Sequence, residues 1–247
     1  MGRTLNEIAY YYLTSVKQFS DDKTADIRLV KSWVRTSRAI WIRNTLNKNG
    51  TVPEEFIQDL GVITLEVVDQ SDVGLDSGFK ILRTVKQIPT MIDTKHEPTI
   101  VRIGPGTTRS ASYKFISYHR VPFIGNGRFN NTTIFSFIKN KYIYILSKDD
   151  GILTPGMRKI TVRGVLEDPT EAASFVKADG TLCYTELSEY PISEYLIGYM
   201  KNTIISIDFN ILVNAAEDEK NNARDDVQLQ VPKSVQKQNS GGEEEQQ

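Results

Sequence analysis

Histidine, cysteine and close carboxylate pairs supply most of the general bases, metal ligands and nucleophiles in proteins. This sequence of 247 residues contains two histidines, His96 and His119, and one cysteine, Cys183. We expect residues 117–119 to lie on a strand and His96 in a loop, each histidine being an ordinary surface or hydrogen-bonded side chain. The sequence therefore predicts no catalytic residue, no metal site and no cofactor, and favours a protein that is not an enzyme.

Two glycine-rich segments have the spacing of phosphate-binding loops without completing such a motif. They are residues 103–106 (Ile-Gly-Pro-Gly) and 124–128 (Ile-Gly-Asn-Gly-Arg). Neither ends in Gly-Lys-Ser/Thr, and neither has a third glycine that opens a helix. We interpret both as turns between strands, where glycine tolerates a positive φ.

Four cations form the clearest candidate for a binding surface. Arg28, Lys31, Arg35 and Arg38 are spaced three and four residues apart, which places them along one face of an expected helix. Such a face could contact DNA phosphates or an acidic partner. A solvated helix face is the ordinary alternative.

Aromatic residues near the N-terminus suggest a contact between subunits. The run Tyr10, Tyr11 and Tyr12 is wider than one buried stripe needs, so we interpret Tyr10 and Tyr11 as interface residues. Trp33 and Trp41, on the expected basic helix, are interpreted as core or subunit contacts.

Three helical segments are expected before residue 62. Thr4 and Glu7 form a capping box at the start of the first. The second runs from about residue 24 to 48 and stops at Asn49 and Gly50. The third is a short helix within residues 51–61, with Pro53 in its first turn.

From Val62 the hydrophobic residues alternate with the period of a strand. Strands are expected at residues 63–67, 79–85, 99–103, 133–138, 142–146 and 159–166, with a hairpin turn near Asn140. The connections are too short for helical crossovers, so the block should be antiparallel.

The C-terminal third returns to helix and then becomes polar. Asp168 and Pro169 start a short helix to about residue 177, and a longer helix runs from Tyr190 to about residue 216. Residues 217–247 have little to bury and should be disordered alone. We expect them to form an extended arm that docks on a partner through the alternating residues Val227, Leu229 and Val231.

These elements predict an α+β fold. Its parts are an N-terminal helical region at 1–61, an antiparallel β-rich region at 62–166, a C-terminal helical region at 167–216 that packs on the N-terminal helices, and a polar extended arm at 217–247. With 30 Lys and Arg against 31 Asp and Glu, the net charge of −1 gives no global attraction to nucleic acid or to anionic membranes.

The cysteine count and the hydropathy indicate the compartment in which the protein assembles and whether it contacts a membrane. One cysteine cannot form an intrachain disulfide, which fits assembly in a reducing cytoplasm. No apolar run approaches the roughly 18 residues of a membrane span, and no signal peptide is evident. We therefore expect a soluble protein without membrane contact.

Several segments resemble structural proteins of crAss-like tailed bacteriophages. They are residues 4–10 (Thr-Leu-Asn-Glu-Ile-Ala-Tyr), 37–43 (Ser-Arg-Ala-Ile-Trp-Ile-Arg) and 58–61 (Gln-Asp-Leu-Gly), with 167–171 and 190–194 similar in character. The resemblance is to neck or ring proteins that act as head-to-tail connectors. It implies a virion subunit in a ring of twelve copies that contacts the portal protein and neighbouring tail proteins. It also implies that the ring continues the DNA channel and that one terminal arm of each subunit enters the portal.

Two other function classes remain open at this stage. One is a nucleic-acid-binding module that uses the four cations of the second helix. The other is a hydrolase of host envelope polymers, although the sequence offers no convincing acid/base pair for it.

Overall fold

The structure is a computed structural model, which describes residues 2–19, 26–51, 53–74, 78–95, 97–106, 112–124, 133–148 and 150–209. The chain divides into a unit formed by Met1–Ile204 and a second unit formed by Ile205–Gln247. Helices and a mostly antiparallel sheet both belong to the first unit, so the predicted α+β class is confirmed.

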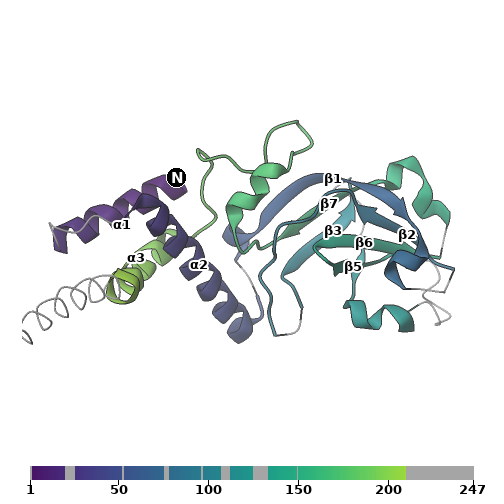
Figure 1. Cartoon of the computed structure of the whole chain (residues 1–247), viewed down its shortest axis with the longest axis horizontal. Coiled ribbons are helices and arrows are strands. Elements are labelled where there is room, and N and C mark those ends of the chain that lie inside the picture. Colours follow the sequence, from purple (N-terminus) through teal and green to yellow (C-terminus); the bar gives the residue numbers. More distant parts are fainter. Residues whose placement is uncertain are drawn as a thin grey trace, which may run out of the picture. The chain divides into compact units, whose positions relative to one another are not determined.

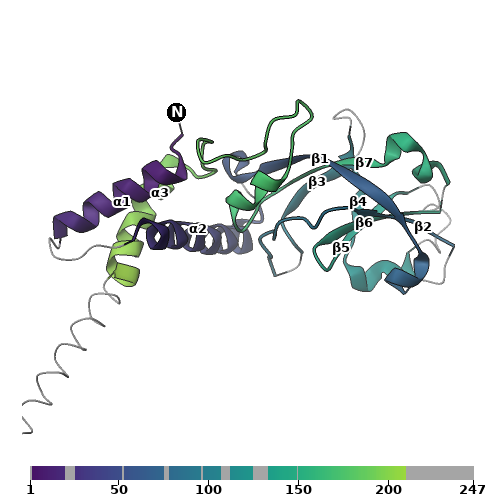
Figure 2. The same ribbon diagram turned by 45° about the horizontal axis from the view of Figure 1, so that its top comes forward.

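Three α-helices lie side by side in this unit (Figures 1 and 2). They are α1 (Leu5–Phe19), α2 (Ile27–Asn49) and α3 (Glu194–Thr203). Their apolar residues recur every three or four positions, which gives each helix one buried face. The Tyr12 hydroxyl of α1 donates to the Ile197 carbonyl oxygen of α3 at 2.7 Å, and so joins helices that are far apart in the sequence.

Local capping sets the ends of the first two helices. The Thr4 amide donates to a Glu7 carboxylate oxygen at 2.8 Å, and the Glu7 amide donates to the Thr4 hydroxyl at 3.2 Å, which confirms the predicted capping box. Asp26 caps α2 by accepting from the Arg28 amide. Gly50 ends α2 with a φ of +71°, as the sequence predicted.

Seven strands form one sheet in the order β3-β7-β1-β2-β6-β5-β4. All neighbouring pairs are antiparallel except β4 with β5, which confirms most of the predicted pairing. The hairpin between β5 and β6 turns at Asn140 and Lys141, both of which have positive φ. The strands are β1 (Gln58–Val68), β2 (Lys80–Thr84), β3 (Ile100–Pro105), β4 (Lys114–Phe115), β5 (Phe135–Lys139), β6 (Tyr142–Ser147) and β7 (Lys159–Gly164).

The sheet curls so that its two edge strands approach each other. The long strand β1 pairs with β7 through its first half and with β2 through its second half. The Tyr113 amide, just before β4, donates to the Ile103 carbonyl oxygen of β3 at 2.7 Å. The edges of the sheet therefore meet at this bond.

Several strands are buried on both faces. On β2, Leu82 belongs to the main core that also includes the helices, whereas Ile81 belongs to a second apolar cluster. The second cluster contains Val73 and Val121, from the 3-10 helices η2 (Gln70–Val73) and η3 (Tyr118–Phe123). Because successive side chains of a strand point to opposite faces, this arrangement requires nearly continuous apolar strands.

Three local predictions are wrong. Residues 51–61 contain only the 3-10 turn η1 (Glu54–Phe56), and strand β1 already begins at Gln58 because its backbone pairs with β7. His119 lies on η3 and not on a strand. Gly104 is buried within β3, so it is not part of a turn.

The segment that leads to α3 is mostly irregular. Asp168 caps the 3-10 helix η6 (Pro169–Ser174) by accepting from the Thr170 amide, where the sequence had predicted a helix to about residue 177. The 3-10 helices η4 (Asp150–Leu153) and η5 (Pro155–Met157) precede β7, and η7 (Ile204–Phe209) has π-helical bonding. The predicted remainder of the last helix lies outside the described residues.

Gly61 should be the glycine whose replacement costs the most stability. Its φ is +65°, and a Cβ at this position would overlap the Val176 carbonyl oxygen, a backbone atom that cannot rotate away. Gly61→Ala should therefore lower the free energy of unfolding in urea by clearly more than the roughly 1–2 kcal/mol of a left-handed backbone alone. The control is Gly50→Ala, at φ +71° with open space around the Cβ. Equal losses for the two variants would contradict the close approach at Gly61.

Candidate functional site

Exposed tyrosines line the helices α1 and α3. Tyr10 is 60% exposed and Tyr11 is 39% exposed, because Ile8, Ala9 and Tyr12 take the buried face of α1. On α3, Tyr195 and Tyr199 are exposed one helical turn apart, opposite the buried residues of that helix. These rings give the helical part of the molecule a large aromatic surface, which is typical of protein interfaces.

Two of these rings are fixed by neighbouring side chains. The Tyr11 ring lies 5.2 Å from the Arg3 guanidinium carbon and 4.8 Å from the Lys201 ammonium nitrogen, both within the range of cation–π attraction. The Tyr195 ring contacts Trp41 edge-on at 5.9 Å. The rings of Tyr11 and Tyr195 are thus held in place before any partner binds.

An apolar stripe runs along the outward side of α2. Leu29 and Ile40 are exposed, and Trp33 between them is partly buried against the core. The three are spaced four and seven residues apart, so they share one side of the helix. Trp33 therefore packs on the core, which is one of the two roles that the sequence had left open for it.

The four predicted cations do not form one solvent-facing row. Arg28 is exposed and Lys31 half-buried, whereas Arg35 makes an ion pair with Asp168 at 2.7 Å. Arg38 is 0% exposed and cannot contact a ligand at the surface. The predicted basic face therefore loses Arg38, because that side chain has partners inside the protein.

Arg38 binds two carbonyl groups from distant parts of the chain. Its Nε donates to the Pro191 carbonyl oxygen at 2.8 Å, and its Nη1 donates to the Leu166 carbonyl oxygen at 2.9 Å. The guanidinium carbon lies 5.6 Å from the Tyr190 ring and 5.9 Å from the Phe56 ring. Burial lowers the pKa of Arg38 below its usual value, while Tyr190 and Asp168 act in the opposite direction.

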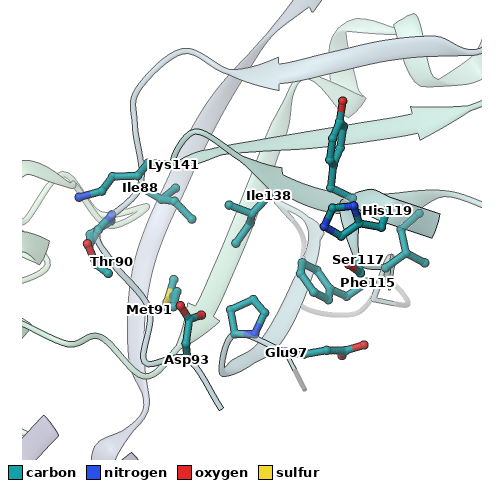
Figure 3. A pocket seen from close by; sticks show the side chains of 14 residues that line it. Ile88, Thr90, Met91, Asp93, Glu97, Phe115, Ser117, His119, Ile138 and Lys141 are labelled. Atoms are coloured by element: carbon teal, nitrogen blue, oxygen red, sulfur yellow. The ribbon is translucent and has the colours of Figure 1, made fainter. Parts of the chain in front are cut away.

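A cavity of about 340 Å³ is lined by the segment 88–98 that precedes β3, by residues 115–119 at the end of β4 and after it, and by Ile138 and Lys141 of the β5–β6 hairpin. Figure 3 shows Ile88, Met91, Phe115 and Ile138 around the hollow, with Lys141 and His119 on opposite sides of it in this view. Its lining is thus apolar in the middle and charged at the edge.

The thiol of Cys183 is not activated as a nucleophile. Burial raises the pKa of Cys183 to about 11, with the carboxylates of Asp59 and Asp179 adding to the effect, so the thiol is protonated at neutral pH. Within the described residues, no group of three or more His, Cys, Asp or Glu side chains could hold a metal ion. His96 lies outside that part of the chain.

No helix in the described ranges is both long enough and apolar enough to cross a lipid bilayer. The predicted arm residues Val227, Leu229 and Val231 lie outside the described residues.

Sequence reasoning missed several exposed apolar residues. Tyr195, Tyr199, Leu29 and Ile40, all of which are exposed, were not singled out from the sequence. Helical periodicity could have placed Tyr195 and Tyr199 opposite Leu196 and Met200. The cavity had no sequence signal, since it depends on how segment 88–98, residues 115–119 and the β5–β6 hairpin come together.

Aromatic and apolar side chains that face outward on helices are typical of surfaces that contact other proteins. The family model for phage tail ring protein 2 matches residues 7–227. The chain belongs to this family, and it is therefore a structural protein of the virion tail. A search of curated proteins gives no match.

Arg38→Ala should destabilise the fold strongly, because the Leu166 and Pro191 carbonyl groups would lose a charged donor inside the protein. We expect the free energy of unfolding in urea to fall by about 3–5 kcal/mol. The control Arg28→Ala removes an exposed side chain of the same helix and should change it by about 0.5 kcal/mol or less. A similar loss in the free energy of unfolding for both variants would show that the hydrogen bonds of Arg38 do not stabilise the fold.

Proposed function

We propose that the protein is a subunit of a head-to-tail connector in a short-tailed phage, in a ring of twelve copies that attaches to the portal vertex and continues the DNA channel. Membership of the tail ring family is the observation that carries this proposal. The resemblance of residues 4–10, 37–43 and 58–61 to neck proteins supplies the position at the portal and the copy number. Assembly takes place in the host cytoplasm.

The aromatic surface supplies contacts between ring subunits in this proposal. Tyr10 and Tyr11 are exposed and ordered, and Trp33 lies in the apolar stripe of α2. Large rings held in place lose little conformational freedom on binding, so they contribute more of their buried area to affinity. Ring closure lets individually weak contacts hold together, because every subunit is then bound on two sides.

The C-terminal arm is the second contact in this proposal. Residues 217–247 bind the portal protein or a neighbouring ring, with Val227, Leu229 and Val231 as alternating apolar anchors. Such a contact adds affinity without enlarging the interface of the folded unit.

A weak contact with DNA in the channel is a further part of the proposal. Arg28 and Lys31 remain available on α2, whereas Arg35 is paired with Asp168 and Arg38 is buried. Two cations support non-specific phosphate contact and no more. The separate nucleic-acid-binding module is therefore not proposed.

Replacing the exposed tyrosines should prevent ring formation. The double variant Tyr10→Ser and Tyr11→Ser should sediment as a monomer under conditions in which the wild-type chain, alone or mixed with the portal protein, forms a closed ring in electron micrographs. Val85→Ser, which removes an exposed apolar residue after β2, is the matched control and should leave the ring intact. A wild-type chain that stays monomeric in both settings would refute the ring.

Removing residues 217–247 should separate portal attachment from self-assembly. The shortened chain should still form rings, but its dissociation constant for the portal protein should rise by about 100-fold, because the tethered second contact is lost. Surface plasmon resonance on the assembled portal measures this. Changing Val227, Leu229 and Val231 together to Ser in the full chain should give the same loss, and unchanged portal binding in both variants would remove the arm from the proposal.

A further inference from the structure

Positive charge is concentrated in one part of the sequence. Residues 80–164, from the start of β2 to the end of β7, contain 15 Lys and Arg and four Asp and Glu, which gives a net charge of +11. The rest of the chain contains 15 Lys and Arg and 27 Asp and Glu, which gives −12. We call residues 80–164 the basic segment. A charge asymmetry of this size indicates a partner that is a polyanion.

The charges of the basic segment lie on the surface. Among its described residues, eight Lys and Arg are exposed, against the two exposed carboxylates Asp93 and Glu97. The exposed cations belong to several elements, with Lys114 on β4, Arg120 on η3 and Lys159 on β7. Because their fields add outside the protein, the potential around this segment is positive.

Two arginines stand opposite each other on the outer face of the sheet. Arg102 of β3 and Arg163 of β7 are register partners on adjacent strands, so their side chains leave the same face. The next pair along these strands, Ile103 and Val162, points into the main core. Like charges in directly opposite positions destabilise a sheet. An anion bound by both guanidinium groups would remove this repulsion.

Further cations continue along β7. Lys159 is exposed on the same face, four residues before Arg163, which is about 13 Å along a strand. Arg158, next to it, is also exposed. Two carboxylates lie beside Arg163: Asp59 is its register partner on β1, and Glu54 is 3.7 Å away with its side chain 86% exposed. Such an exposed ion pair is weak, so this face retains an excess of positive charge.

The composition of this surface favours DNA over a protein partner. Six of the eight exposed cations are lysines, which are depleted in protein interfaces. Among the described residues, the basic segment exposes three large apolar side chains, Val85, Val101 and Phe123, whereas residues 165–204 expose five in about half the length. Contact with phosphates requires charge and little apolar area, and it does not depend on base sequence.

We propose that the basic segment binds the phosphates of duplex DNA, with Arg102, Lys159 and Arg163 on the outer face of β3 and β7 as one of its contact points. The choice of DNA rests on the proposed function, in which the ring continues the DNA channel. The acidic remainder of the chain repels the same phosphates, so each subunit turns its strands toward the DNA. Arg28 and Lys31 of α2 contribute less, because they belong to that remainder.

Fluorescence anisotropy with a labelled duplex of random sequence tests this surface in the full-length chain. The triple variant Arg102→Gln, Lys159→Gln and Arg163→Gln should bind about tenfold or more weakly at low salt. The slope of log K against log salt concentration should fall by about one unit for each lost phosphate contact. Unchanged affinity and slope would contradict the proposed contact point.

The matched control removes the same charge from another part of the fold. The changes Arg28→Gln, Arg43→Gln and Lys48→Gln replace three exposed cations of α2. This variant should lose much less affinity than the triple variant of β3 and β7. An equal or larger loss in the control would place the DNA contact on α2 and overturn the inference.

A single change gives a second measurement that does not depend on the folding of the triple variant. Lys159 is exposed, so Lys159→Glu should leave the unfolding midpoint unchanged. It should weaken DNA binding more than Lys159→Gln does, because a carboxylate repels the phosphate. Equal binding by wild type, Lys159→Gln and Lys159→Glu would contradict the proposal.

Electron micrographs of the same samples separate this inference from the proposed ring. Wild-type rings that bind no DNA at low salt would overturn the inference and leave the proposed function standing. If the triple variant then failed to form rings or to bind the portal protein, the basic surface would be a protein contact. DNA binding by a chain that stays monomeric would support this surface and refute the ring.

Discussion

The Arg38 guanidinium is where three distant segments of the chain are bonded together. It is supplied by α2, and it donates to the carbonyl oxygens of Leu166, just after β7, and of Pro191, just before α3. A buried charge without partners is strongly unfavourable, so this arrangement is stable only when all three segments are in place. The relation of the helices to the sheet is therefore fixed by a polar interaction as well as by apolar packing.

Interactions beside Arg38 connect it to further elements of the fold. Arg35, one turn before Arg38, pairs with Asp168, which also caps η6. Tyr12 bonds to α3, and the buried Tyr190 lies beside the guanidinium. The turn that carries the exposed Leu187 ends in this network, at Tyr190 and Pro191.

The molecule exposes apolar groups that contribute nothing to the stability of a monomer. The tyrosines of α1 and α3, the stripe on α2 and Leu187 all belong to ordered elements. The proposed ring gives them a physical reason, since each subunit of a ring must be bound by two neighbours.

The sequence by itself determined the features that depend on neighbouring residues. The capping box of Thr4 and Glu7, the stop at Gly50, the hairpin turn at Asn140 and most strands follow from local hydrogen bonding and periodicity. Only the tertiary structure decided the rest. Helical spacing put Arg38 in a row of cations, but whether it meets solvent depends on carbonyl groups 128 and 153 residues away. Residues 58–61 became strand through pairing with β7, and the cavity arises where segment 88–98, residues 115–119 and the β5–β6 hairpin meet. Such long-range contacts leave no mark on the local pattern.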